Sequence, residues 1–136
     1  MTASFATYDE LRAAIGREVA VSDWVPVTQA QIDGFGAVTG AGDAPGLFLL
    51  SLWPRIGYGL LTLPEAALSV NYGLDRARFA GPVRAGHRVR ARLAPAAVED
   101  VAGGVQIHWR VTLEVEGVAE PACIAETISR RYARPT

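Results

Sequence analysis

Residues 105–116 of the chain read VQIHWRVTLEVE, and apolar side chains alternate with polar ones throughout this stretch. A period of two residues is the pattern of a β-strand, because successive side chains of a strand point to opposite faces. The stretch therefore predicts an antiparallel sheet with one buried face and one face open to solvent. His108 falls on the open face and is expected to be a solvated strand residue.

Strand signals continue on both sides of this stretch. Gly103-Gly104 precedes it and predicts a hairpin turn, and residues 88–93 before that turn alternate arginines with apolar side chains. Residues 66–72 also have a period of two, and Gly73-Leu74-Asp75 is expected to make a turn before extended structure resumes. Residues 121–132 predict the last strand of the sheet.

Helices are expected in the first half of the chain. Thr28 and Gln31 have the spacing of a capping box, which predicts a helix that begins there and ends near Gly40. Residues 46–61 have little polar face and predict a buried helix, with a kink or a boundary at Pro54. A short helix over 8–15 that ends at Gly16 and a short strand over 18–25 complete the layout. Helices thus precede a run of antiparallel strands, which is an α+β fold with one helix covering the sheet.

The composition excludes several kinds of chemistry. The 136 residues fit one domain, and half of them are hydrophobic, so a core can form. The net charge of -1 gives no reason to expect nucleic acid or a membrane as partner. All 13 basic residues are arginines, which excludes Schiff-base chemistry on a lysine. Cys123 is the only cysteine, so neither an intrachain disulfide nor a cysteine zinc cluster is expected. The first residues lack the pattern of a secretory signal, and a cytoplasmic location is expected.

Three segments in a fixed order carry a resemblance to one protein family. The first runs from Val27 to Gly40, the second from Gly46 to Pro54, and the third reads NYGLDRARF at residues 71–79 and continues through residues 82–86. Together they resemble the MaoC-like acyl dehydratases, the R-specific enoyl-CoA hydratases of the hot-dog fold. The third segment is the most specific. The resemblance covers nearly the whole chain and implies a single MaoC-like domain over residues 1–136.

The resemblance implies a fold, an assembly and a reaction. A long central helix would be wrapped by a curved antiparallel sheet, and acyl-thioester sites would lie at the interface of a dimer. The reaction would be syn addition of water across a 2-enoyl thioester, or its reverse on a 3-hydroxyacyl thioester. Coenzyme A or an acyl carrier would hold the acyl group, and no metal or redox cofactor would take part.

The catalytic segment of this chain departs from the family's pattern. Members of the family carry an Asp followed five residues later by a His, because two groups must handle protons on one face of the double bond. Asp43 follows Thr39-Gly40 here, but Phe48 stands five residues further on. Only residues 41–45 join the two expected helices, and this short connection indicates a deletion through the catalytic loop.

Three residues near this connection are candidates for catalysis, each with a structural alternative. Asp43 is either the surviving half of the acid–base pair or a loop residue that caps the next helix. Gly46 matches the glycine whose N–H meets the thioester carbonyl in the family, or it simply allows a tight turn into a packed helix. Ser51 matches a small polar position that contacts the acyl group or Asp43, or its hydroxyl is bonded to its own helix.

Substrate-binding residues are assigned in the third segment. Asn71, Tyr72 and Gly73 match the strand end at which the family's backbone meets the CoA arm. Arg76 and Arg78 belong to the main concentration of basic residues in the chain. Guanidinium groups suit phosphate because they are planar, bidentate and always charged.

Other charged residues are given structural interpretations. Arg88, Arg90 and Arg92 share one face of a strand, and such a stripe is usually only solvated. His87 follows Gly86 at a turn and is expected to be a surface residue. Neither histidine of the chain is therefore expected where a catalytic base should be.

Three functions stay open from the sequence. The first is an active hydratase-type enzyme that uses Asp43 and a substitute partner group. The second is a non-catalytic subunit that shapes half of an acyl tunnel, so the dimer would be either a homodimer or a heterodimer with a related hot-dog subunit. The third is a changed chemistry on the same scaffold, such as cyclisation, isomerisation or epoxide opening of a polyketide-like molecule.

Overall fold

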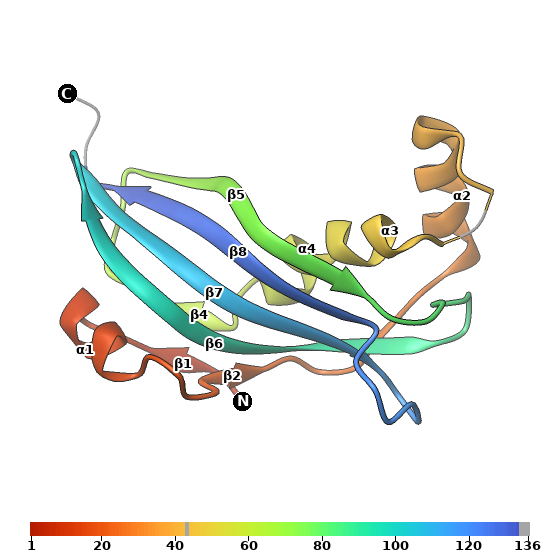
Figure 1. Ribbon diagram of the computed structural model, residues 1–136, viewed down its shortest axis with the longest axis horizontal. Helices are drawn as coiled ribbons and strands as arrows, with labels where there is room; N and C mark the ends of the chain where they lie inside the picture. Colours follow the sequence, from red (N-terminus) through yellow and green to blue (C-terminus); the bar gives the residue numbers. More distant parts are fainter. Residues whose placement is uncertain (43, 134–136) are drawn as a thin grey trace.

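The computed structural model describes residues 1–42 and 44–133, in which a curved sheet wraps around two short helices (Figure 1). The helices are α1 (Tyr8–Ala13), α2 (Gln29–Thr39), α3 (Gly46–Ser51) and α4 (Trp53–Gly57). The strands are β1 (Ala3–Ser4), β2 (Ala20–Val21), β3 (Val25–Pro26), β4 (Leu61–Thr62), β5 (Leu68–Phe79), β6 (Arg88–Val101), β7 (Gly104–Val115) and β8 (Cys123–Tyr132). This content confirms the predicted α+β class. None of the described helices is long and apolar enough to cross a membrane.

The main sheet has six strands in the described part of the chain. Its order along the hydrogen-bonded path is β2-β6-β7-β8-β5, and β3 also pairs with β6. All of these pairs are antiparallel. A separate parallel pair of β1 and β4 ties the start of the chain to the segment after α4. β5 therefore lies at one edge of the sheet, with β8 as its only partner strand in the described part of the chain.

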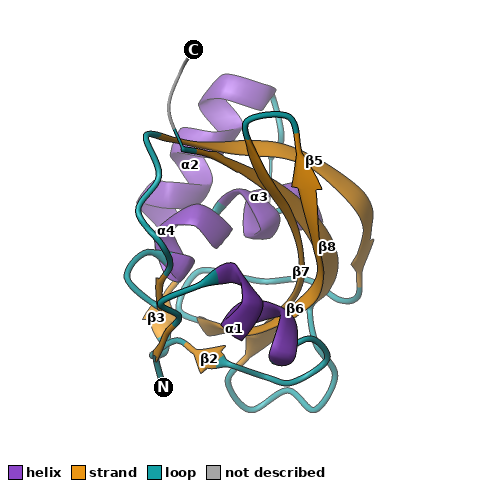
Figure 2. Ribbon diagram, turned by 90° about the vertical axis from the view of Figure 1, so that its left-hand side faces the viewer, coloured by secondary structure: helices purple, strands orange, loops and turns teal. Residues whose placement is uncertain are grey.

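The sheet has an inner face, which carries α3 and α4, and an outer face on the opposite side (Figure 2). The apolar residues of 105–115 are all buried on the inner face, as their alternation predicts. Phe48 and Leu49 of α3 and Ile56 of α4 belong to the same core. Removal of apolar area from water stabilises by roughly 25 cal/mol per Å², so this shared core holds the helices against the sheet.

The predicted capping box at Thr28, the helix end at Gly40 and the hairpin turn at Gly103 are confirmed. The Thr28 hydroxyl accepts a hydrogen bond from the Gln31 N–H at 3.1 Å, and the Gln31 side chain accepts one from the Thr28 N–H at 3.0 Å. This capping box begins α2, and Gly40 ends the helix with a φ of 80°. Gly103 has a φ of 77° in the hairpin turn between β6 and β7. Glycine reaches such positive φ values at little cost.

The helix predicted over residues 46–61 is shorter than expected and divided in two. α3 and α4 meet at residues 51–53, so Pro54 stands in the first turn of a new helix, where its missing N–H costs no hydrogen bond. The predicted boundary at Pro54 is confirmed, but the predicted extent is wrong. Leu61 already belongs to β4, and Gly59, with a φ of 79°, lies between helix and strand.

The first short elements also differ from their predicted bounds. α1 is confirmed within residues 8–15 and ends before Gly16. The strand predicted over 18–25 is divided into β2 and β3, which pair with different parts of β6. Ser22 lies between them, and its hydroxyl accepts a hydrogen bond from the Ala91 N–H of β6 at 2.9 Å. A side chain thus satisfies one β6 amide where the backbone ladder is interrupted.

The turn predicted at residues 73–75 is wrong, because β5 continues through them while hydrogen-bonded to β8. Two irregularities of the β-bulge kind absorb the extra residues, one between Asn71 and Gly73 and one between Leu74 and Arg76. A bulge places two residues opposite one, so each shifts the alternation of side chains by one residue. A glycine such as Gly73 can indicate either a β-bulge or a turn, and the sequence pattern alone does not distinguish the two.

The arginine stripe of β6 lies on the outer face and is paired with carboxylates. The ion pairs are Arg88–Glu116 at 2.9 Å, Arg92–Glu18 at 2.8 Å, Arg92–Glu114 at 3.0 Å and Arg90–Glu114. Burial raises the pKa of Glu114, but the hydrogen bond from Arg90 and the charge of Arg92 outweigh it, and the pKa lies below its ordinary value. This pairing agrees with the interpretation of the stripe as a charged strand face.

We expect the Glu114→Gln variant to lose about 1–2 kcal/mol of unfolding free energy at neutral pH, because the hydrogen bonds from Arg90 and Arg92 lose their charged acceptor. A carboxyl with a lowered folded pKa contributes stability above its unfolded pKa, and this contribution is lost as pH falls through the folded pKa. The difference between wild type and variant should therefore shrink below about pH 4. Urea unfolding at neutral and acid pH measures both effects.

Glu116→Gln is the matched control, because Glu116 is half exposed and forms its one ion pair among the described residues with Arg88. It should change the unfolding free energy by less than about 0.5 kcal/mol. Equal losses in the two variants would contradict a special contribution of Glu114.

Candidate functional site

An inner groove runs between the two short helices and the β5–β8 side of the sheet. It consists of two adjoining cavities of about 220 and 230 Å³, which share Trp53, Pro54, Asn71, Thr127 and Ile128. The other lining residues are Leu50, Ser51, Gly73 and Leu74 in the first cavity and Gly57, Tyr58, Trp109 and Ser129 in the second. Most of these side chains are apolar, so the inner groove suits a hydrocarbon chain that carries few polar groups.

The break between α3 and α4 shapes the helical wall of the inner groove. Trp53 lies at this break, and its ring packs so closely on Gly57 that a Cβ there would lie 2.7 Å from ring atoms. The opposite wall comes from the bulged part of β5, where Leu74 pairs with Thr127 of β8. The groove therefore depends on two local irregularities, a broken helix and a bulged strand.

Gly46 begins α3 directly beside the ring of Phe79, the last residue of β5. A Cβ at Gly46 would overlap the Phe79 side chain, so only glycine permits this approach of strand and helix. The steric interpretation of Gly46, a tight turn into a packed helix, is thus explained by the Phe79 ring. The first N–H groups of a helix have no hydrogen-bond partner within the helix. The Gly46 N–H can therefore still donate to a thioester carbonyl, as the resemblance implies.

Ser51 lines the inner groove, and its hydroxyl donates a hydrogen bond to the Phe48 carbonyl at 2.6 Å. The bond to its own helix is therefore present, as the structural alternative predicts. The hydroxyl proton is engaged, and the Ser51 oxygen keeps its capacity to accept a hydrogen bond.

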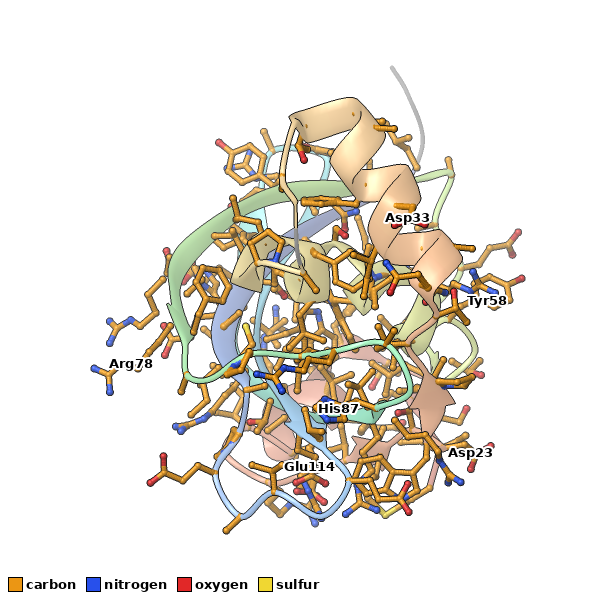
Figure 3. The ribbon with its side chains drawn as sticks, turned by 90° about the vertical axis from the view of Figure 1, so that its right-hand side faces the viewer. Asp23, Asp33, Tyr58, Arg78, His87 and Glu114 are labelled. Carbon is orange, nitrogen blue, oxygen red and sulfur yellow. The ribbon has the colours of Figure 1, made fainter. Side chains whose placement is uncertain are left out.

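Asp43 lies outside the described residues, so the site is described without it. Its neighbours Gly42 and Ala44 line a further cavity of about 480 Å³, together with residues of α2 and of the loop at 82–85. Figure 3 shows α2 standing away from the sheet above this loop. The connection that carries the predicted catalytic Asp thus runs between α2 and the start of α3.

The sheet separates the residues predicted to bind substrate. Asn71 and Gly73 line the inner groove. Tyr72 lies on the outer face, where the Arg130 guanidinium is 3.7 Å from the centre of its ring. Arg76 and Arg78 line a hollow on the outer face, and Figure 3 shows Arg78 pointing away from the molecule. Alternation along β5 produces this separation, because two bulges that each shift it by one residue restore it, and Leu74 between them is the residue that they turn inward.

Neither histidine lines the inner groove. His108 is confirmed on the outer face, where its Nδ1 lies 2.7 Å from Asp75 Oδ2 and its Nε2 lies 3.0 Å from the Gln106 amide nitrogen. The expectation that His108 is solvated is wrong, because these neighbours leave its side chain 17% exposed. His87 lies in a turn, where its Nδ1 accepts a hydrogen bond from the Arg84 N–H at 3.1 Å.

The described residues bring few other reactive groups together. In residues 1–42 and 44–133, no group of three or more His, Cys, Asp or Glu side chains is arranged to hold a metal ion. Cys123 is buried on β8, and burial raises the pKa of its thiol. A protonated, inaccessible thiol is a poor nucleophile.

Sequence reasoning missed two kinds of residue in the inner groove. Thr127 faces it because of its pairing with Leu74 across the strands, and no local pattern signals such a pairing. The turn predicted at residues 73–75 gives Leu74 no place in the groove, whereas the bulged course of β5 puts its side chain there. Trp53 is partly buried and lines the groove, although its residue type alone would suit the core equally well.

Comparison with known proteins places these features in a family. No family model matches the chain. The chain is 39% identical over 149 aligned residues to the 3-hydroxyacyl-thioester dehydratase Z of Mycobacterium tuberculosis, with 96% of this chain and 99% of that protein covered. It is 30% identical over 141 aligned residues to the nodulation protein N of Rhizobium leguminosarum, with 88% of each chain covered.

Solved structures show the same fold at low sequence identity. A monoamine oxidase regulatory protein of Archaeoglobus has a TM-score of 0.76 at 16% identity, covering 99% of both chains. The MaoC-like dehydratase of Rhodospirillum rubrum has a TM-score of 0.69 at 15% identity, covering 90% of this chain and 95% of that one. A chain of the ChsH1-ChsH2 complex of Mycobacterium tuberculosis has a TM-score of 0.61 at 12% identity, covering 94% and 90%.

These structural similarities confirm the expected hot-dog fold. The curved sheet and its inner helices place the chain in this class of proteins. The relative at 39% identity goes further than the fold. The chain belongs to the family of the MaoC-like 3-hydroxyacyl-thioester dehydratases. Because 149 aligned positions exceed the 136 residues of this chain, the mycobacterial relative contains residues that have no counterpart here.

The contact between Gly46 and Phe79 gives a direct test of the steric interpretation. Gly46→Ala should lower the unfolding free energy by about 1–3 kcal/mol, because the added methyl group overpacks the ring. Thermal unfolding measures the change. Gly34→Ala, inside α2 with nothing within 4 Å of an added Cβ, is the control and should stabilise by about 0.5–1 kcal/mol. A Gly46→Ala variant as stable as wild type would show that the Phe79 ring does not need this glycine.

Proposed function

We propose that the chain binds the acyl part of 2-enoyl or 3-hydroxyacyl thioesters in the inner groove, as one half of a hydratase- or dehydratase-type site. The observation that carries this proposal is an apolar groove that lies along α3 and α4 in a chain of this family. The hydrocarbon chain would lie against Trp53 and Leu74 and extend toward Trp109. Burial of apolar area on binding would supply most of the affinity.

The thioester group would lie at the start of α3. An N–H in the first turn of a helix has no partner within the helix, so it can donate a hydrogen bond to the thioester carbonyl. This hydrogen bond would stabilise the negative charge that develops on the carbonyl oxygen during the reaction. Gly46 would supply this N–H, with the Phe79 ring limiting the space around the carbonyl. Ser51 and Asn71 would offer polar contacts further along the inner groove, toward a 3-hydroxyl group.

Acid–base chemistry needs groups beyond the described lining of the inner groove, which contains neither a carboxyl nor an imidazole group. Asp43 is the candidate nearest in sequence to Gly46. The relative's additional residues and the short connection at 41–45 support loss of the second group from this chain. A second subunit would then supply it.

The β5 edge supports an assembly with a second hot-dog subunit. Its large apolar side chains are 42–52% exposed, namely Leu68, Tyr72, Leu74 and Phe79. An edge strand with exposed apolar side chains and unpaired backbone groups is a site for pairing with another chain. The structural neighbour named as a complex of ChsH1 with ChsH2 favours a heterodimer of two related subunits over a homodimer.

Two alternatives have specific support. A homodimer that hydrates thioesters with Asp43 alone is favoured by the place of Asp43 three residues before Gly46. A changed chemistry on a bulkier, polyketide-like ligand is favoured by the open, mostly apolar form of the inner groove. The assays below separate these functions from the proposed one.

Acyl binding can be measured with S-hexanoyl-N-acetylcysteamine through the fluorescence of Trp53 and Trp109. Leu74→Asp should weaken binding at least about tenfold, because an apolar contact worth about 1.5–3 kcal/mol is replaced by a charge. Leu68→Asp is the matched control, since Leu68 is 52% and Leu74 is 50% exposed on the same strand. Leu68 pairs with Tyr132 outside the inner groove and should have little effect. Equal effects of the two variants would contradict acyl binding in the inner groove.

Hydration can be followed by the loss of absorbance of crotonyl-CoA. The chain alone should give the rate of buffer, and addition of a related hot-dog subunit that forms a stable complex with it should raise the rate. If the chain alone is active and Asp43→Asn lowers kcat at least about a hundredfold, the homodimer that uses Asp43 is correct instead. Binding of acyl thioesters without hydration in any combination of subunits would favour the changed chemistry.

A further inference from the structure

The second cavity of the inner groove, of about 230 Å³, carries most of the polar side chains of the groove. We call it the distal cavity. The hydroxyl groups of Tyr58 and Ser129 line it and do not line the first cavity. The Thr127 hydroxyl and the Asn71 amide line both cavities. Hydrogen-bonding groups thus gather in one part of a groove that is otherwise mostly apolar.

The distal cavity lies at the end of the inner groove that is farther from Gly46. Gly46 begins α3 beside Phe79, the last residue of β5, whereas Tyr58 follows the end of α4 (Figure 1). Asn71 stands in the first half of β5 and pairs there with Ser129 of β8. An acyl chain whose thioester lies beside Gly46 would therefore pass through the first cavity before it reaches the distal cavity.

The polar groups of the distal cavity keep hydrogen-bonding capacity for a ligand. Trp109 Nε1 donates a hydrogen bond to Ser129 Oγ at 3.3 Å. Within residues 1–42 and 44–133, this is the only hydrogen bond of the Ser129 side chain, so its own proton is left to donate. In the same residues, the side chains of Asn71 and Thr127 form no hydrogen bond with another residue.

A ligand that fills the distal cavity would cover these groups. Thr127 and Ser129 are partly exposed in the unliganded chain, so water can bond to them. Among the described residues, every fully buried side-chain nitrogen or oxygen has a hydrogen-bond partner. A plain hydrocarbon end would cover the hydroxyl groups without replacing their bonds to water, and such burial is unfavourable. A ligand end that carries oxygen would supply the missing partner.

The arrangement of the polar groups fits a neutral hydroxyl group. Thr127 and Ser129 are two residues apart on β8, so their side chains lie on the same face of the sheet, and Asn71 pairs with Ser129. A ligand hydroxyl there can accept a hydrogen bond from Ser129 and donate one to the Asn71 or Thr127 side-chain oxygen. A carboxylate fits less well, because the described lining of the distal cavity contains no positively charged residue.

We propose that the distal cavity recognises a hydroxyl group near the far end of the acyl chain, through Ser129, Thr127 and Asn71. The substrate would then be a thioester of a hydroxylated acyl chain and not of a plain fatty acyl chain. This inference rests on the proposed function, in which the acyl chain lies in the inner groove, and adds to it the chemistry of the far end of the chain.

Calorimetric titration can compare S-(6-hydroxyhexanoyl)-N-acetylcysteamine with S-heptanoyl-N-acetylcysteamine. The two thioesters have equal numbers of non-hydrogen atoms, so a hydroxyl group replaces a methyl group at constant size. The 8-hydroxyoctanoyl and nonanoyl pair repeats the comparison on a longer chain. In at least one pair, the hydroxylated thioester should bind to the wild type at least about five times more tightly, the effect of about one net hydrogen bond. In an apolar cavity it would bind more weakly than the plain thioester.

Two variants test which groups recognise the hydroxyl. Ser129→Ala and Thr127→Val should each reduce the preference for the hydroxylated thioester to less than about twofold. Thr127→Val keeps the shape of the side chain, so it remains informative if Ser129→Ala is less stable because the Trp109 N–H loses its partner. Ser69→Ala is the matched control, because it removes a hydroxyl group from β5 at a residue that lines neither cavity. It should leave the preference unchanged.

The outcomes separate this inference from the proposed function. If the wild type binds the plain thioesters at least as tightly as the hydroxylated ones in both pairs, acyl binding stands and recognition of a hydroxyl group is wrong. A preference that persists in both Ser129→Ala and Thr127→Val would also overturn it, since the hydroxyl group would then be bound elsewhere. If the wild type binds none of these thioesters, the proposed function is wrong and this inference fails with it.

Discussion

The apolar side chains of β7 and its neighbouring strands must leave water together, and α3 supplies the surface against which they do so. Phe48 and Leu49 belong to the same core as the buried residues of the sheet. This shared burial curves the sheet around the helix and places the start of α3 beside the end of β5. The contact of Gly46 with Phe79 follows from it, and so does the position of the inner groove.

The bulges of β5 decide which of its side chains lie on each face of the sheet. They direct Leu74 into the inner groove and Arg76 to the outer face, although these residues are separated by two positions and would share one face of a regular strand. Asp75 occupies the second bulge and is held by His108. His108 therefore has a structural partner on the outer face and does not line the inner groove.

Family membership and catalytic competence are separate properties of this chain. The 39% identity to a 3-hydroxyacyl-thioester dehydratase establishes the family, and the alignment is longer than the chain. The core shared by β7 and α3 keeps the hot-dog fold, and Ala44, just before α3, packs against it. Loss of a residue inside β7 would turn its buried face to solvent, so this strand tolerates no change of length.

The sequence by itself determined the elements whose signals are local. The alternation of 105–115, the capping box at Thr28 and the hairpin at Gly103 required only neighbouring residues, and the motif resemblance predicted the hot-dog fold. The tertiary structure decided the course of β5, the division of the central helix and the composition of the inner groove. Strand register and bulges depend on hydrogen bonds to β8, a partner more than 40 residues away in the chain, and no local pattern records them.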